Sequence, residues 1–130
     1  MATASVHPLF GRWPLGQVTL PAQDLARAVT FYRDTLLVPF LFQTPALAFF
    51  NCDGVRLMLA LPERPAAAQT GSILYFRVAD LRAACDELRS RGIAFSDEPH
   101  LIATMPDHEL WMAFFTDSEG NTLSLMSEVR

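Results

Sequence analysis

The feature that most restricts the fold of this 130-residue chain is an internal repeat. A strand-like segment, an Asp suited to cap a helix and a helical run of apolar residues occur twice, the second copy 56 positions after the first (24 to 80). The matching pairs are Asp24 with Asp80, Leu25 with Leu81, Ala28 with Ala84 and Arg33 with Arg89. A repeat of this length predicts two similar units packed together, because one such unit cannot bury its apolar face alone.

The first unit is predicted to contain a strand, a helix and three further strands. Residues 17–20 alternate polar and apolar side chains, as in a half-buried strand, and Asp24 stands where a helix N-cap is expected. The helix that follows has an apolar stripe at helical spacing, formed by Leu25, Ala28, Val29, Tyr32 and Leu36. Strands are then expected at residues 39–43, 46–51 and 55–61. The Asp53-Gly54 pair between the last two is a strong hairpin signal.

The second unit repeats this order. A strand is expected at residues 73–78, and a helix begins after the N-cap Asp80 and stops at Gly92. The last three strands are expected at 93–95 with a continuation, at 109–115 and at 122–126. The predicted fold class is α+β, with two βαβββ modules that form a curved mixed sheet around a concave pocket. We expect an N-terminal arm at residues 1–14 and one domain at 15–129, made of modules 15–62 and 71–129, with a connector at 62–70.

The two helices are predicted to cover the outer face of the curved sheets, with one core beneath them. The core is expected to include Leu25, Val29, Leu59, Phe76, Leu81, Leu88 and Leu125. Hydrophobic residues make up 51% of the chain and charged residues 18%, which favours a compact fold over a disordered one.

Charge and cysteine content narrow the function classes. The net charge is −4 and arginines do not cluster, so nucleic acid is not an expected partner. We find no signal-peptide run and no uninterrupted apolar stretch, and expect neither export nor a membrane anchor. Cys52 and Cys85 lack the spacing of a metal site and are interpreted as reduced thiols, which predicts a cytoplasmic protein.

Three segments resemble a known family. They are residues 17–25 (QVTLPAQDL), 31–36 (FYRDTL) and 114–128 (FFTDSEGNTLSLMSE). Together with the repeat they resemble the glyoxalase/bleomycin-resistance/dioxygenase superfamily, also called vicinal oxygen chelate proteins, over residues 15–129. The resemblance implies the fold predicted above and, because members commonly pair, a homodimer. It does not select a function, since the superfamily includes isomerases, epimerases, dioxygenases, thiol transferases and drug-sequestering proteins.

The resemblance also identifies four positions at which many members hold a divalent metal, usually through His, Glu or Gln. Here those positions carry Gln17, Met58, Ile73 and Ser124. Gln17 is the one familiar ligand type among them, Met58 is too soft for Mg, Mn or Fe, and Ile73 cannot coordinate an ion. We therefore expect no metal at these positions and no cofactor.

Strand alternation gives an independent prediction of the pocket. If the apolar residues of the first and last strands of each module face the helices, their neighbours face the other way. The ligand-binding set is then Gln17, Thr19, Arg56, Met58, Ile73, Tyr75, Ser124 and Met126. This mixture of apolar and hydrogen-bonding groups suits a small organic or aromatic molecule, although the same residues could fill a sheet interior without binding anything.

A second candidate site lies in residues 100–109. If this segment forms a hairpin that turns near 104–106, His100 and His108 come from facing strands, with Glu109 or Asp107 nearby. Such a group could act in general acid/base catalysis or hold a displaced metal, or the segment could be a solvated loop. The favoured function is metal-independent binding of a small molecule. The alternative is a metal-dependent lyase, isomerase or dioxygenase that uses the His100/His108 cluster as its catalytic residues.

Overall fold

The computed structural model describes residues 9–62 and 72–130, and it confirms the α+β class and the two βαβββ modules. The first eight residues of the predicted arm and most of the predicted connector lie outside the described residues. A short helix, α1 (Leu9–Arg12), precedes the modules. The first module contains β1 (Gln17–Pro21), α2 (Leu25–Thr30), its π-helical continuation η1 (Phe31–Thr35), β2 (Phe40–Gln43), β3 (Leu47–Cys52) and β4 (Val55–Ala60). The second contains β5 (Leu74–Arg77), α3 (Leu81–Ser90), β6 (His100–Thr104), β7 (Glu109–Thr116) and β8 (Thr122–Val129).

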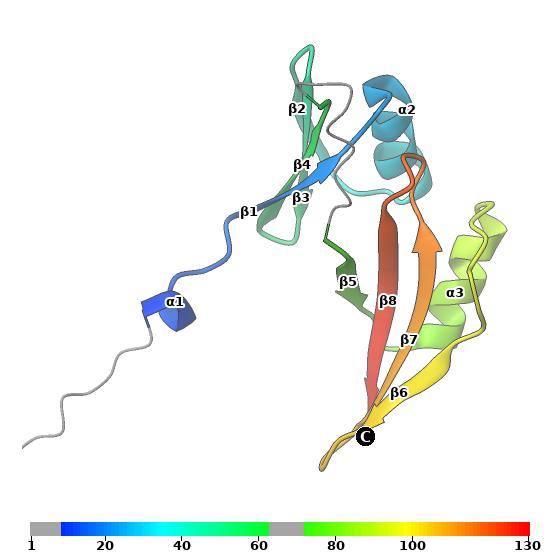
Figure 1. Ribbon diagram of the computed structural model, residues 1–130. Helices are drawn as coiled ribbons and strands as arrows, with labels where there is room; N and C mark the ends of the chain where they lie inside the picture. The colour runs from blue at the N-terminus through cyan, green and yellow to red at the C-terminus, as the bar shows by residue number, and fades with distance from the viewer. Residues whose placement is uncertain (1–8, 63–71) are drawn as a thin grey trace, which may run out of the picture.

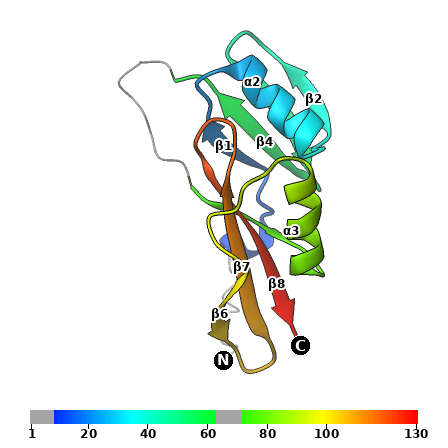
Figure 2. The same ribbon diagram turned by 90° about the vertical axis from the view of Figure 1, so that its right-hand side faces the viewer.

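Each module forms a four-stranded mixed sheet. The strand orders are β1-β4-β3-β2 and β5-β8-β7-β6. In both, the strand before the helix pairs in parallel with the last strand of the module, and the other pairs are antiparallel. Helices α2 and α3 lie on the same side of their sheets, to the right in Figure 1, and Figure 2 shows that side. No helix of the described residues covers the opposite face of either sheet, and we call these two surfaces the helix-free faces.

The two helix starts have the same local chemistry. The side chains of Asp24 and Asp80 accept the backbone N–H of Arg27 and Ala83, each at 3.0 Å, as the N-cap prediction requires. Helix α3 ends before Gly92, whose φ of +90° is the left-handed conformation typical of a helix C-terminus. Both predicted helices therefore begin at the positions that sequence reasoning gave them.

The predicted Asp-Gly hairpin is also present. Asp53 and Gly54 have φ values of +48° and +92°, which is the pattern of a type I′ turn, and Cys52 pairs with Val55 across it. This turn fixes the register of β3 against β4.

One hydrophobic core runs through both modules, beneath the helices. Its buried members include Leu20, Leu25, Tyr32, Phe50, Leu57, Leu59, Leu81, Cys85, Phe115, Leu123 and Leu125. Two predicted core residues, Phe76 and Leu88, are packed against this cluster but only partly buried. No helix within residues 9–62 and 72–130 is long and apolar enough to cross a membrane.

The first β segment after α3 differs from the prediction. Residues 93–95 do not form a strand: Ile93 is buried in the core, and Phe95 makes one isolated bridge to Phe115. The strand that pairs with β7 begins later, at His100. Pro99 explains part of this boundary, because proline has no N–H to donate to a neighbouring strand.

Candidate functional site

The helix-free face of the first module is formed by alternate residues of β1, β4, β3 and β2. Gln17 lies opposite Arg56, and Thr19 lies opposite Met58. The amide Nε2 of Gln17 is 3.8 Å from the Met58 sulfur. The predicted alternation is confirmed, because the intervening residue Leu57 is fully buried on the helix side.

Aromatic rings extend this face across β3 and β2. Phe49 lies opposite Met58 in β3, and its ring is stacked on that of Phe42, with the centroids 4.5 Å apart and the planes 23° apart. The guanidinium carbon of Arg56 lies 6.0 Å from the Phe49 centroid. Phe49 is 9% exposed whereas Phe42 is 50% exposed, so the Phe42 ring presents its surface to solvent.

The helix-free face of the second module is also aromatic. The Phe114 ring lies 6.2 Å from Tyr75 and 6.2 Å from His100, measured between centroids. Met126 pairs with Met112 on β7, and Tyr75 is 46% exposed. Large apolar side chains are thus left in contact with solvent on both helix-free faces.

Two members of the predicted ligand-binding set lie differently from the others. Ser124 pairs with Tyr75 but has no exposed surface, and its Oγ lies 3.1 Å from both the Ala113 and the Leu125 carbonyl oxygens. Its hydroxyl is therefore satisfied by backbone. Ile73 precedes β5 and is 39% exposed.

These positions do not suit the divalent metal that the resemblance implies. Ile73 supplies no donor, the Ser124 hydroxyl is buried and hydrogen-bonded to backbone, and the Gln17 amide contacts a soft thioether. Divalent ions in proteins are held by several converging N, O or S ligands. In the part of the chain that the structure describes, no group of three or more His, Cys, Asp or Glu residues could hold an ion.

The His100/His108 hairpin exists, but it does not bring the two imidazoles together. His100 lies opposite Met112, whereas His108 lies in the turn before β7. The expectation that the two side chains are cross-strand neighbours was wrong, because the register places them at different heights along the hairpin. A register shift between Leu101 and Ala103 sets this pairing and still leaves His100 four positions beyond His108 on the facing strand.

Each member of this predicted cluster has a separate partner. His100 Nδ1 is 3.1 Å from the Glu98 carbonyl oxygen, and His108 Nδ1 is 2.7 Å from Asp107 Oδ1. Hydrogen bonding to His108 lowers the pKa of Asp107. The Glu109 carboxylate accepts the Trp111 indole N–H at 3.1 Å. The geometry therefore gives no shared acid/base centre.

Sequence reasoning missed a polar junction between the modules. The Glu119 side chain, in the β7–β8 turn, has no exposed surface. Its Oε1 accepts the backbone N–H groups of Gln23 and Asp24, both at 2.8 Å. Arg27 donates to Oε2 at 2.7 Å and to Oε1 at 3.1 Å, and Ser118 Oγ donates to Oε2 at 2.8 Å. Burial alone would raise the pKa of Glu119, but these hydrogen bonds lower it to about 2.

Asp117 forms the second half of this junction. It accepts the Tyr32 hydroxyl at 2.6 Å and the Asn121 side-chain amide at 2.7 Å. Asn121 also donates to the Pro21 carbonyl oxygen at 2.8 Å, which ties the turn to the end of β1. Burial and the Asp117 charge raise the pKa of Tyr32. From the sequence, Asp117 and Asn121 are predicted only as turn residues. The one available signal is that Tyr32 lies on the apolar stripe of its helix, where a buried hydroxyl needs a hydrogen-bond partner.

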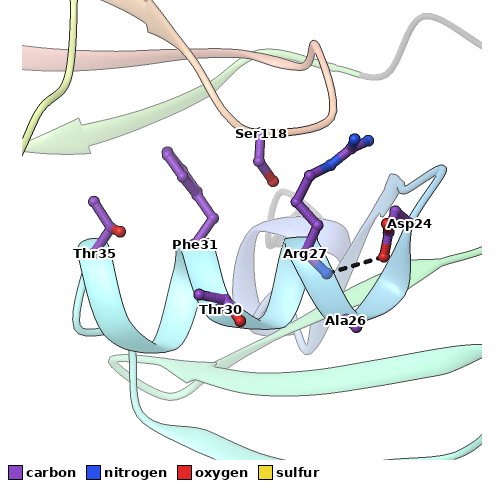
Figure 3. Close-up of a pocket in the computed structure, with 7 residues that line it drawn as sticks. All are labelled: Asp24, Ala26, Arg27, Thr30, Phe31, Thr35 and Ser118. Atoms are coloured by element: carbon purple, nitrogen blue, oxygen red, sulfur yellow. Dashed lines mark hydrogen bonds between the residues drawn. The ribbon is translucent and has the colours of Figure 1, made fainter.

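A shallow hollow of about 430 Å³ lies beside this junction, on the helix side of the molecule. Figure 3 shows its lining, which comes from Asp24, Ala26, Arg27, Thr30, Phe31, Thr35 and Ser118. The Arg27 guanidinium at its edge is already bound by Glu119, so this arginine is not free to bind an anionic ligand in the hollow.

A family model matches residues 15–125, and its description is Glyoxalase/Bleomycin resistance protein/Dioxygenase superfamily. Comparison with curated proteins gives no match.

Solved structures share the fold at low sequence identity. A glyoxalase/bleomycin resistance protein/dioxygenase from Nocardioides is 23% identical, with a TM-score of 0.71 over 92% of this chain and 85% of that one. A lactoylglutathione lyase from Agrobacterium tumefaciens is 22% identical, with a TM-score of 0.66 over 88% and 92%. TnmS3, an antibiotic binding protein from Streptomyces sp. CB03234, is 23% identical, with a TM-score of 0.67 over 89% and 96%.

Proposed function

Because the chain belongs to the Glyoxalase/Bleomycin resistance protein/Dioxygenase superfamily, we propose that it binds a small aromatic molecule on its helix-free faces, without a metal. The observation that carries this proposal is the exposure of Phe42 and Tyr75, 50% and 46%, on the sides of the sheets that no helix covers. Exposed aromatic rings beside a few hydrogen-bonding groups are typical of ligand sites. The antibiotic binding function named for TnmS3 agrees with this class of activity.

The proposed contacts are the accessible members of the predicted set. They are Gln17, Thr19, Arg56, Met58, Ile73, Tyr75 and Met126. Ser124 supports Tyr75 from the neighbouring strand and does not reach the ligand, because its side chain is buried.

Metal independence is supported by donor chemistry. An amide, a thioether, a hydrocarbon and a backbone-bonded hydroxyl do not form a divalent site. The metal-dependent enzyme alternative has no geometric support either, since His100, His108 and Glu109 have separate partners.

We also propose a homodimer in the cytoplasm. In the described part of the chain, β1 and β5 are edge strands. Their edges and the exposed apolar side chains support association with a second copy. The free thiols of Cys52 and Cys85 suit a reducing compartment.

Thermal-shift screening followed by calorimetry tests the binding function. An aromatic compound at about 100 times its Kd is expected to stabilise the protein by about 2.7 kcal/mol.

Phe42→Ser and Tyr75→Ser should weaken binding of this compound. Phe10→Ser, which removes an exposed ring from the arm, should leave binding unchanged. Elemental analysis should find less than one metal ion per chain, and EDTA should leave binding unchanged. Binding that is lost with EDTA, or no response to any aromatic compound, would contradict the proposal.

A further inference from the structure

Arg56 differs from most arginines of this chain. Six others lie within 4.0 Å of a carboxylate oxygen: Arg27, Arg33, Arg77, Arg89, Arg91 and Arg130. Within residues 9–62 and 72–130, Arg56 forms no such pair and its guanidinium donates no hydrogen bond, although the chain has a net charge of −4. Among the described residues this charge therefore has no carboxylate partner, although the chain has more carboxylates than arginines.

The residues beside Arg56 on the helix-free face are uncharged. Gln17 flanks it on β1 and Asn51 flanks it on β3. The Asn51 side-chain oxygen already accepts the Gly54 N–H at 2.9 Å, and the Gln17 amide is directed to Met58. None of the described residues of β1 to β4 that point to this face is acidic. No described residue therefore occupies the positive charge of Arg56, which can pair with an acidic group of a bound molecule.

An aromatic surface lies next to this charge. The guanidinium lies over Phe49, and the Phe42 ring stacked on Phe49 is half exposed. The guanidinium carbon is 6.0 Å from the Phe49 centroid, and that centroid is 4.5 Å from the Phe42 centroid, so the charge lies at most about 10.5 Å (6.0 plus 4.5) from the Phe42 ring. A flat ligand of one or two fused rings with an acid group at one end spans this distance.

We infer that the molecule bound on the helix-free face of the first module is an aromatic carboxylate, with its rings against Phe42 and Met58 and its carboxylate on Arg56. The inference rests on the proposed function and specifies its ligand class. A guanidinium matches a carboxylate through two parallel hydrogen bonds, and its position over a ring keeps it orientated. A neutral analogue of the same shape lacks the charged acceptor that Arg56 requires.

Calorimetry with three probes of one shape tests the inference: 2-naphthoate, the neutral 2-naphthamide and the cationic 2-naphthylmethylammonium. We expect 2-naphthoate to bind at least about tenfold more tightly than 2-naphthamide, which is the contribution of about one charged hydrogen-bonded contact, and the cation to bind weakest. Arg56→Gln should abolish this preference, and Arg56→Lys should restore part of it. Because Arg56 is exposed, neither change disturbs the core.

Arg82→Gln is the matched control. Arg82 is also exposed, also lacks an ion pair in the described chain, and lines a separate hollow beside Trp111 on the helix side. It should leave the preference for 2-naphthoate unchanged. Loss of the preference with Arg82→Gln, or its survival in Arg56→Gln, would overturn the inference. Equal binding of 2-naphthoate and 2-naphthamide would overturn the inference about the ligand class but leave the proposed function standing. If none of the three probes binds and the wider aromatic screen also finds no ligand, both the inference and the proposed function are overturned.

Discussion

Glu119 shows how one side chain can hold two modules together. Its carboxylate satisfies two backbone N–H groups at the start of α2 and one arginine, all of which belong to the other module. A buried carboxylate is costly unless it is paired, and the start of a helix is a favourable place for negative charge. The residue is therefore part of the first module's helix cap, although it lies 92 positions from Arg27.

Glu119 predicts how stability responds to acid. Its pKa in the folded state, about 2, lies below the value of 4.5 expected in the unfolded chain, so its contribution is present above pH 4.5 and is lost as the pH falls towards 2. We expect a loss of about 1 to 2 kcal/mol in the free energy of unfolding; the loss is no larger because solvent screens the half-exposed Arg27.

The Glu119→Gln variant should be less stable than wild type by this amount at pH 7, and its stability should depend less on pH in the acid range. Urea unfolding at several pH values measures both effects. An unchanged pH profile in the variant would contradict the prediction, and Asp34→Asn, in an exposed ion pair, is the control.

The starts of α2 and α3 form a natural comparison between equivalent elements. Asp24 has φ and ψ of −128° and 105°, and Asp80 has −124° and 100°, so the repeat is conserved in backbone conformation as well as in sequence. The difference is that α2 has the additional carboxylate of Glu119 at its N-terminus. The two caps should therefore not contribute equally to stability.

Asp80→Ala is expected to cost about 1 kcal/mol of unfolding free energy, because the N–H of Ala83 loses its partner and no other carboxylate of residues 9–62 and 72–130 caps α3. Asp24→Ala should cost less, because Glu119 still interacts with the start of α2 and is relieved of a like charge nearby. Chemical denaturation of both variants measures the difference, and Asp80→Asn, which keeps an acceptor, should be close to wild type. A larger cost at Asp24 than at Asp80 would show that the Glu119 contact does not compensate.

Sequence reasoning was successful where structure depends on local chemistry. The helix caps and the hairpin turn involve only contacts within a few positions along the chain, so their roles can be predicted from the local sequence. They are formed by Asp24, Asp80, Gly92 and the Asp53-Gly54 pair. Strand alternation likewise identified which side chains in the first and last strands of each module turn away from the helices.

Long-range contacts were beyond that reasoning. The start of β6 depends on pairing with β7, and the separation of His100 from His108 depends on the register of that pair. The junction joins Tyr32 to Asp117 across 85 positions. Parity could assign Arg56 to the helix-free face, but only the structure shows that no carboxylate of the described residues lies beside it.

The whole molecule has an uneven distribution of apolar surface. The core beneath α2 and α3 is shared by both modules, whereas the helix-free faces and the segment before β1 are open to solvent. In Figure 1, α1 lies well away from both sheets. Phe10, Trp13 and Leu15 are 85%, 53% and 66% exposed, and the rings of Phe10 and Trp13 pack on each other at 5.2 Å.

This distribution predicts that the N-terminal segment packs on a second copy of the chain. A helix of four residues is not stable by itself in water, and monomers rarely leave three large apolar side chains exposed within six positions. Sedimentation velocity should give twice the 14.5 kDa mass of the chain. Phe10→Ser combined with Trp13→Ser should shift the distribution towards monomer, while Phe10→Leu with Trp13→Leu, which keeps the segment apolar, should retain more of the dimer. A wild-type protein that sediments as a monomer at every concentration would contradict the dimer. A serine variant that dimerises as strongly as wild type would show that association does not depend on the N-terminal segment.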